Sequence, residues 1–120
     1  PTQYLLEVCR RRRNIIPIMA DASRPDCYVP LVESVDLIYQ DIAQPDQASI
    51  ALRNCGFLKE NGLLILMLKT RSVNVRKEPA EVFQDTIACL ISGGLIIRET
   101  VWLTPYHHDH AAIICTKPGL

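Results

Sequence analysis

Four side chains that can do acid–base or binding chemistry lie beside predicted strands of this chain: Asp21, Asp41, Lys69 and His110. Residues 35–40 (VDLIYQ) form an apolar stretch that ends at Asp41 and is followed by a short loop and a helix. In open α/β sheets, ligands bind beyond the carboxyl ends of the strands. His110 opens a strand that we predict to be antiparallel, so it lies at that same edge. The spacing therefore predicts one site built from all four groups.

Lys69 carries the most specific chemistry of the four. It ends the apolar run GLLILMLK (62–69), which we interpret as a strand buried on both faces. A carboxylate beside an ammonium favours its charged form, whereas burial favours the neutral amine. Either form is useful next to a hydroxyl that must lose a proton. A strand-end Asp alone is commonly a helix cap, so only the convergence of the groups favours a functional interpretation.

Helices and strands alternate along most of the chain. The pattern predicts helices over 3–13, 44–58 and 78–92, and strands over 14–19, 35–40, 62–69, 95–103 and 110–116. This alternation predicts an α/β fold with a mostly parallel, doubly wound sheet. The last two strands have only a loop between them and must be antiparallel. Pro17 favours an edge position for the first strand, and Asn61-Gly62 predicts a turn.

Composition limits the function classes. The chain has 120 residues, which suits one domain, and its 13 basic and 13 acidic residues cancel. Net charge therefore gives no argument for nucleic-acid binding. The five cysteines are scattered without a C-x-x-C pair, which argues against a disulfide framework or a zinc site and for a reducing compartment. We interpret these cysteines as small hydrophobic residues in or near the core. The longest apolar run, 63–68, is too short to span a membrane, and the N-terminus has no signal-peptide pattern.

Three further signals have a functional and a structural interpretation. The arginines at 10–13 could contact phosphate, but we favour a solvated last helical turn. The run HHDH (107–110) could hold a metal only as a small exposed site, and Asp109 more simply fixes its loop. Trp102 and Tyr106 could stack on bases, although Trp102 in a strand favours the core.

Several segments carry a resemblance that covers the whole chain. They are NIIPIMADAS (14–23), VDLIYQDIAQPDQA (35–48), FLKENGLLILMLKT (57–70), EPAEVF (78–83) and PYHHDHA (105–111). Together they resemble the fibrillarin family of RNA ribose 2′-O-methyltransferases. The block D-[IV]-A-Q-P-x-Q followed by P-Y-x-x-D-H-A is highly specific. The resemblance implies a Rossmann-like S-adenosylmethionine-dependent methyltransferase fold with an antiparallel last strand.

The resemblance also implies roles for individual residues. The family transfers a methyl group from S-adenosylmethionine to a ribose 2′-hydroxyl that a box C/D guide RNA selects. The residues that match its cofactor-binding positions are Asp21 and Ala22 at the adenine, and Asp41, Ile42, Ala43 and Gln44 at the methionine end. Asp41, Lys69 and His110 match three of the four catalytic positions. Lys69 is then the base or the group that stabilises the 2′-oxygen.

The family pattern begins with elements that residues 1–120 do not contain: a strand with a Gly-rich loop, a second strand ending in an acidic residue, and an upstream catalytic lysine. We therefore expect residues 1–120 to be the C-terminal two-thirds of a methyltransferase domain that does not bind S-adenosylmethionine normally by itself. In the family's strand order, the absent strands lie between 14–19 and 35–40. We expect 14–19 either to pair directly with 35–40 or to pair with another molecule, and we expect self-association through exposed sheet edges.

The function predicted from the resemblance is 2′-O-methylation of ribosomal RNA during pre-rRNA processing, with this chain inactive alone. Its partners would be the box C/D guide RNA, the substrate rRNA and the box C/D scaffold protein, with no membrane and no metal. One alternative is a truncated, non-catalytic module that docks in the ribonucleoprotein, and another is a histone glutamine methyltransferase. The sequence favours a nucleolar, eukaryotic setting, or the cytoplasm if the source is archaeal.

Overall fold

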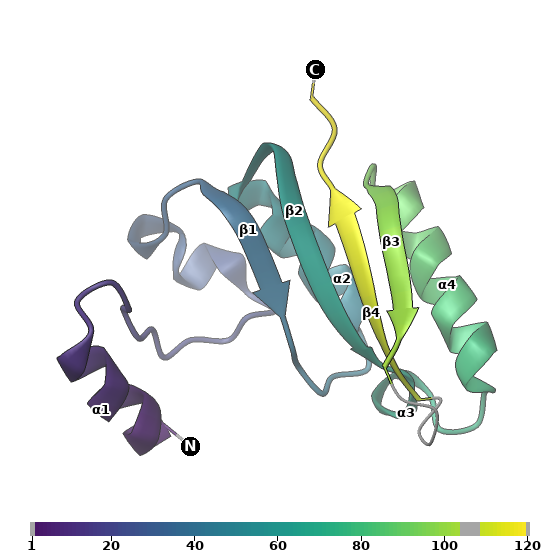
Figure 1. The fold of residues 1–120 in the computed structure, drawn as a ribbon, viewed down its shortest axis with the longest axis horizontal. Coiled ribbons are helices and arrows are strands. Elements are labelled where there is room, and N and C mark those ends of the chain that lie inside the picture. The colour runs from purple at the N-terminus through teal and green to yellow at the C-terminus, as the bar shows by residue number, and fades with distance from the viewer. Residues whose placement is uncertain (1, 104–108, 120) are drawn as a thin grey trace.

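A four-stranded sheet is the centre of the molecule (Figure 1). The computed structural model describes residues 2–103 and 109–119. The sheet order is β1-β2-β4-β3, with β1 at Val35–Gln40, β2 at Leu58–Lys69, β3 at Ile96–Trp102 and β4 at His110–Thr116. β1 and β2 are parallel, whereas β4 is antiparallel to both β2 and β3. The predicted α/β class and the antiparallel last strands are confirmed, and the described sheet is mixed.

Four α-helices lie in the described residues; the one at Thr70–Val73 was not predicted, and the other three match the prediction with shifted ends. The four are α1 (Thr2–Arg11), α2 (Gln47–Asn54), α3 (Thr70–Val73) and α4 (Pro79–Ser92), with short 3-10 helices η1 (Pro25–Cys27), η2 (Val29–Leu31) and η3 (Cys55–Phe57). The second predicted helix began three residues too early, and its last turn is η3. α4 begins at Pro79, as expected for a residue without a backbone N–H. It ends at Ser92 and is capped by Gly93, which Gly94 follows with a φ of +96°.

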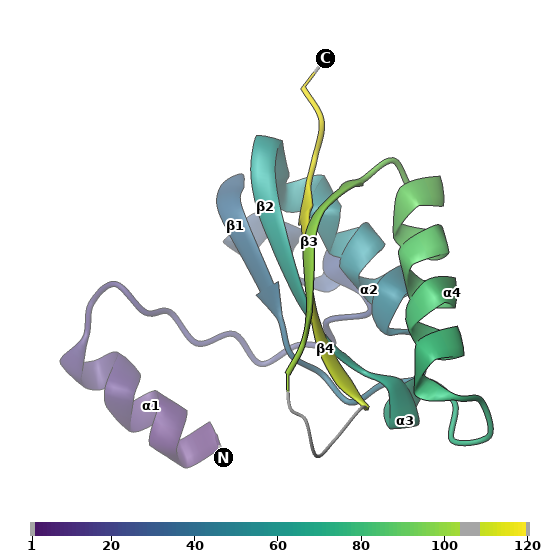
Figure 2. The same cartoon turned by 45° about the vertical axis from the view of Figure 1, so that its right-hand side comes forward.

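The two faces of the sheet have different environments. α2 and α4 cover one face (Figure 2), where Leu64, Leu66 and Leu68 of β2 are at most 1% exposed. On the other face, Leu37, Tyr39 and Leu63 are 50%, 57% and 39% exposed. The prediction that 62–69 is buried on both faces is therefore wrong, since no described helix packs on the second face. Self-association through this sheet's edges stays a prediction.

The strand predicted over 14–19 is wrong. These residues form no strand, and Ile16 and Met19 are 79% and 82% exposed. The segment does not pair with β1, so that part of the expectation is also wrong. A strand exists only through ladder hydrogen bonds to a neighbour, and Pro17 has no N–H to donate.

The turn predicted at Asn61-Gly62 is also wrong, because both residues lie within β2. Asn61 has a φ of +64°, and the β1–β2 register shifts between Val35 and Leu37. The irregularity is held from the C-terminal side, where Asn61 N donates to Lys117 O at 2.7 Å and Lys117 N donates to Gly62 O at 3.1 Å. The turn-forming pair Asn61-Gly62 therefore produces a β-bulge within β2 and not a turn between two strands.

The cysteines divide between core and surface. Cys55 and Cys115 are buried, as predicted, whereas Cys27 and Cys89 are exposed. Burial raises the pKa of the Cys115 thiol to about 11, with a smaller contribution from Cys55. None of the described helices is long and apolar enough to cross a membrane.

Candidate active site

The carboxyl ends of β1 and β2 bring Asp41, Lys69 and His110 together. Lys69 lies directly opposite His110 in the antiparallel β2–β4 ladder. Cross-strand partners project from the same face about 5 Å apart. Asp41 follows the last residue of β1, and its Oδ1 accepts a hydrogen bond from Lys69 Nζ in an ion pair. The predicted convergence of these three residues is found in the structure.

This ion pair lies between core and solvent. The side chains of Lys69 and Asp41 are 30% and 46% exposed. A pair at that depth is partly screened by water and contributes little to stability. It remains open to a ligand from the solvent side. Its position at the carboxyl ends of β1 and β2 therefore suits a role in ligand binding or catalysis better than a role in stabilising the fold.

A second set of bonds fixes the start of β4 relative to the end of β2. Thr70 N and Thr70 Oγ1 both donate to Asp109 O, at 2.8 and 3.1 Å. Thr70 and Asp109 directly adjoin Lys69 and His110 in the sequence, so these bonds fix the spacing of the two candidate catalytic residues. Asp109 Oδ1 is buried and has no hydrogen-bond partner within the described part of the chain.

Four of the six predicted cofactor-binding residues line one hollow of about 300 Å³. Its wall contains Asp21, Ala22, Ile42 and Gln44, with Ala20, Ser23, Asp46 and Ile50 completing the lining. Asp41 lines an adjoining hollow, and Ala43 lines neither. Residues 20–23 and residues 42–46 thus face each other, although no strand precedes Asp21.

Side chains of α2 and η1–η2 hold the loop that carries Asp21 and Ala22. Asn54 Nδ2 donates to Ala22 O at 2.9 Å, and Arg53 Nη1 donates to Ser23 O at 3.0 Å. Ala22 O, at 3.1 Å, and Asn54 Oδ1 share the single hydroxyl proton that Tyr28 Oη donates. These contacts replace a strand as the support of the loop.

The sequence reasoning missed Tyr28, Asn54 and Gln47. A signal for two of them was present in the helical spacing. Gln47 lies three and four residues before Ile50 and Ala51, and Asn54 lies four residues after Ile50, so both polar residues occupy the buried stripe of α2. A polar residue on an apolar stripe needs a partner.

Asp21 is organised by its own turn. Asp21 Oδ1 accepts hydrogen bonds from Ser23 N at 2.9 Å and from Ser23 Oγ at 2.7 Å. The bond from the Ser23 hydroxyl, followed by that from its backbone N–H, lowers the pKa of the Asp21 carboxyl below its usual value. Asp21 is therefore an anionic acceptor at the mouth of the smaller hollow.

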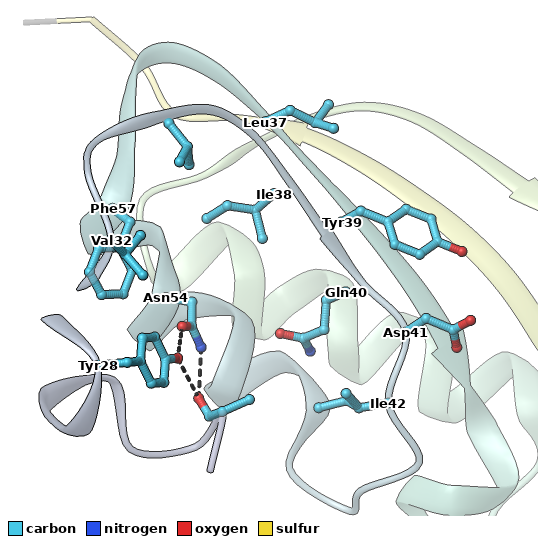
Figure 3. Close-up of a pocket in the computed structure, with 12 residues that line it drawn as sticks. Tyr28, Val32, Leu37, Ile38, Tyr39, Gln40, Asp41, Ile42, Asn54 and Phe57 are labelled. Carbon is cyan, nitrogen blue, oxygen red and sulfur yellow. Dashed lines mark hydrogen bonds between the residues drawn. The ribbon is translucent and has the colours of Figure 1, made fainter. Parts of the chain in front are cut away.

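The adjoining hollow, of about 530 Å³, runs along the free edge of β1 (Figure 3). Asp41 lies at one end of it, and Val32 and Phe57 lie at the other. Tyr28 stacks on Phe57 with ring centroids 5.6 Å apart. Burial raises the pKa of the Tyr28 hydroxyl, which remains a neutral donor. Ala22 and Ile42 line both hollows, so the two lie side by side.

The remaining candidate residues lie apart from this site or outside the described residues. His107, His108 and Tyr106 lie outside them, and within residues 2–103 and 109–119 no three His, Cys, Asp or Glu side chains cluster as metal ligands do. Trp102 packs against Phe83 of α4 with centroids 5.0 Å apart, although it is 38% exposed. The arginines at 10–13 are exposed, and their contact with phosphate stays a prediction.

Comparison with known proteins gives a consistent set of relatives. A family model described as Fibrillarin matches residues 1–118. A fibrillarin-like rRNA/tRNA 2′-O-methyltransferase from Methanoculleus marisnigri is 62% identical over 117 residues, which are 98% of this chain and 58% of that protein. This chain therefore spans little more than half the length of that curated relative.

Two solved structures have the same fold. A fibrillarin crystallised as a complex with Nop5p has a TM-score of 0.90 and 44% identity, over 98% of this chain and 56% of that one. Aeropyrum pernix fibrillarin, solved with natively bound S-adenosyl-L-methionine, has a TM-score of 0.83 and 46% identity, over 96% of this chain and 50% of that one. The first match covers nearly the whole chain. Pairing of residues 14–19 with another molecule stays a prediction.

Proposed function

Because this chain belongs to the fibrillarin family, we propose that it supplies the acceptor side and the adenine side of an S-adenosylmethionine-dependent RNA ribose 2′-O-methyltransferase. The observation that carries the proposal is the Lys69–Asp41 ion pair with His110 opposite Lys69, next to a hollow that contains Asp21 and Ala22. One group of residues suits a reacting hydroxyl and the other suits a bound nucleoside.

The chemistry of the smaller hollow fits S-adenosylmethionine. Ala22, Ile42 and Ile50 offer an apolar wall for a flat base. Asp21, Gln44 and Asp46 offer oxygen acceptors for amino and hydroxyl groups. Asp21 and Asp46 place two carboxylates in the lining, which suits a cationic sulfonium better than a phosphate. We propose Asp21 and Ala22 for the adenine, and Asp41, Ile42, Ala43 and Gln44 for the methionine end.

The bound S-adenosylmethionine would supply an electrophilic methyl group that needs little activation. The protein must then align and deprotonate a weakly acidic ribose hydroxyl. We propose that Lys69, as an ammonium paired with Asp41, stabilises the negative charge that develops on the 2′-oxygen. We propose that His110, on the adjacent strand, accepts the proton. Lys69, if neutral, is the alternative base.

The substrate and partners follow from the family and stay proposals for this chain. We propose ribosomal RNA as the substrate, with a box C/D guide RNA selecting the nucleotide and a scaffold protein of the Nop5p kind holding the complex. A near-neutral chain has no broad basic field to hold RNA by itself. The archaeal relative at 62% identity favours a cytoplasmic setting over a nucleolar one.

The test is methyl transfer by the full gene product assembled with a guide RNA and a scaffold protein. Tritium from the methyl group of S-adenosylmethionine should enter the RNA strand that pairs with the guide. The matched control is the same strand with a 2′-deoxy sugar at the target nucleotide, which should receive no label. Equal labelling of both strands would contradict ribose methylation. Labelling of protein glutamine would favour a histone glutamine methyltransferase. Absence of any transfer would favour a non-catalytic module that docks in the ribonucleoprotein.

A further inference from the structure

Gln47 is a fully buried polar residue that bonds directly to the backbone of Lys69. It is the first residue of α2, and its relative exposure is 0%. Gln47 Nε2 donates to Lys69 O, and Gln47 Oε1 accepts from Lys69 N, both at 3.1 Å. One carboxamide thus satisfies both backbone groups of the residue that carries the amine.

The position of Lys69 explains why its backbone needs this partner. β1 ends at Gln40, which pairs with Leu66, so β2 continues for three residues beyond the β1 ladder. The backbone of Lys69 therefore has no β1 residue beside it. The carboxamide of Gln47 makes the two bonds that another strand would make, at the point where β2 gives way to α3.

Gln47 is itself held in place by β1. Gln40 Nε2 donates to Gln47 O at 2.8 Å, and Gln40 is 7% exposed. The residue that follows Gln40 is Asp41, the ion-pair partner of Lys69. Two side-chain amides therefore connect the backbones that carry the two charged groups.

We propose that Gln47 is a positioning residue for methyl transfer: its carboxamide fixes the backbone of Lys69, so that the amine meets Asp41 on one side and the reacting hydroxyl on the other. The proposal rests on the proposed function of Lys69. A rotation at the end of β2 would move Nζ, and a displacement of about 1 Å at a reacting group costs roughly 10²-fold in rate. Gln47 needs no contact with the cofactor or RNA for this role.

The most informative variant is Gln47→Glu, which retains the shape of the side chain. Burial raises the pKa of the introduced carboxyl. When it is protonated, it can still donate to Lys69 O and accept from Lys69 N. When it is ionised, a charged oxygen faces the Lys69 carbonyl. We therefore expect kcat near the wild-type value at low pH and a fall in kcat as pH rises, which the wild type does not show.

Gln47→Met keeps the volume and removes both bonds at every pH. We expect kcat to fall by roughly 10²-fold, with the KM for S-adenosylmethionine changed by less than about twofold. Gln84→Met, on the exposed face of α4, is the matched control and should keep the wild-type kcat. If Gln47→Met fails to fold, the pH series of Gln47→Glu carries the test.

A readout without catalysis separates this proposal from the proposed function. In Gln47→Met, the amide exchange of Lys69 should become faster and the ¹⁵N resonance of Lys69 Nζ should move relative to wild type. If the wild type is inactive but Gln47→Met shows these changes, the proposed methyltransferase function is overturned, whereas the fixing of the Lys69 backbone by Gln47 is supported. Unchanged Lys69 resonances, or a kcat within about twofold of wild type in both Gln47 variants across the pH range, would overturn the positioning role.

Discussion

The two sides of the candidate site are held by different kinds of structure. On the acceptor side, strand register places Lys69 against His110, and Asp41 follows β1. On the adenine side, Asp21 and Ala22 lie on a loop that side-chain bonds from Tyr28, Arg53 and Asn54 support. Backbone ladders tolerate substitution of the residues they contain, whereas a loop held by side chains depends on each of them. The two sides should therefore respond differently to mutation.

The largest expected effect is on the acceptor side. Lys69→Met should lower the single-turnover rate of methyl transfer by about 10²–10⁴-fold, because it removes the charge beside the reacting oxygen. Binding of S-adenosylmethionine should change much less, since the adenine wall does not include Lys69. Lys77→Met is the control, because Lys77 forms an exposed ion pair with Asp85 at 2.8 Å, on another part of the chain. Equal losses in both variants would contradict a specific role for Lys69.

A core substitution should weaken both sides together. Leu66 is 0% exposed beneath α2 and α4, so Leu66→Ala should lower the free energy of unfolding by about 2–5 kcal/mol. The matched change on the open face, Leu63→Ala, should cost about 1 kcal/mol or less because Leu63 is 39% exposed. Urea denaturation measures both. Similar losses in the two variants would mean that the open face is covered in solution.

The adenine side should be weakened selectively by Asn54→Ala. The substitution removes the bond to Ala22 O and the acceptor for Tyr28 Oη. Loss of about 1.4 kcal/mol of hydrogen bonding would raise the Kd for S-adenosylmethionine roughly tenfold. Tyr28→Phe removes only one hydroxyl and should raise it less. A calorimetric Kd unchanged in Asn54→Ala would contradict the side-chain support of the loop.

The smallest expected effect is the response of the Asp21 turn to acid. The folded-state pKa of Asp21 is lowered by its bonds from Ser23. A lowered pKa stabilises the turn above the unfolded value of 3.8 and loses that stabilisation as pH falls through the folded value. The Ser23 amide resonance should therefore shift with a midpoint below pH 3.8, and Asp21→Asn should abolish this shift. A transition at higher pH would show that the turn does not depend on these bonds.

The sequence predicted the acceptor side well, because its information is local. The run VDLIYQ is β1 with the predicted bounds, and the chain order alone required β3 and β4 to be antiparallel. The chain order therefore predicts His110 at the same edge of the sheet as the carboxyl ends of the other strands. The pairing of β4 with β2, and the register that sets His110 opposite Lys69, required the structure.

The adenine side was harder to predict, because its support is tertiary. Residues 14–19 have the apolar content of a strand, yet strand formation depends on a neighbour, which periodicity does not reveal. The Asn61-Gly62 pair predicts a turn, whereas the positive φ of Asn61 forms a bulge inside β2. The roles of Asn54 and Gln47 depend on which carbonyl groups lie across the fold, and helical spacing alone does not identify these.

The central claim is that the loop at Asp21 and the loop after β1 form one cofactor site. The most direct measurement is a titration of the ¹⁵N-labelled full gene product with S-adenosylmethionine, following the amides of Ala22, Ile42 and Gln44. We predict that all three amides shift along one binding curve. We also predict that Asn54→Ala raises the Kd obtained from each of the three amides by the same factor. Shifts at Ile42 and Gln44 with Ala22 unmoved, or shifts confined to other residues, would contradict the claim.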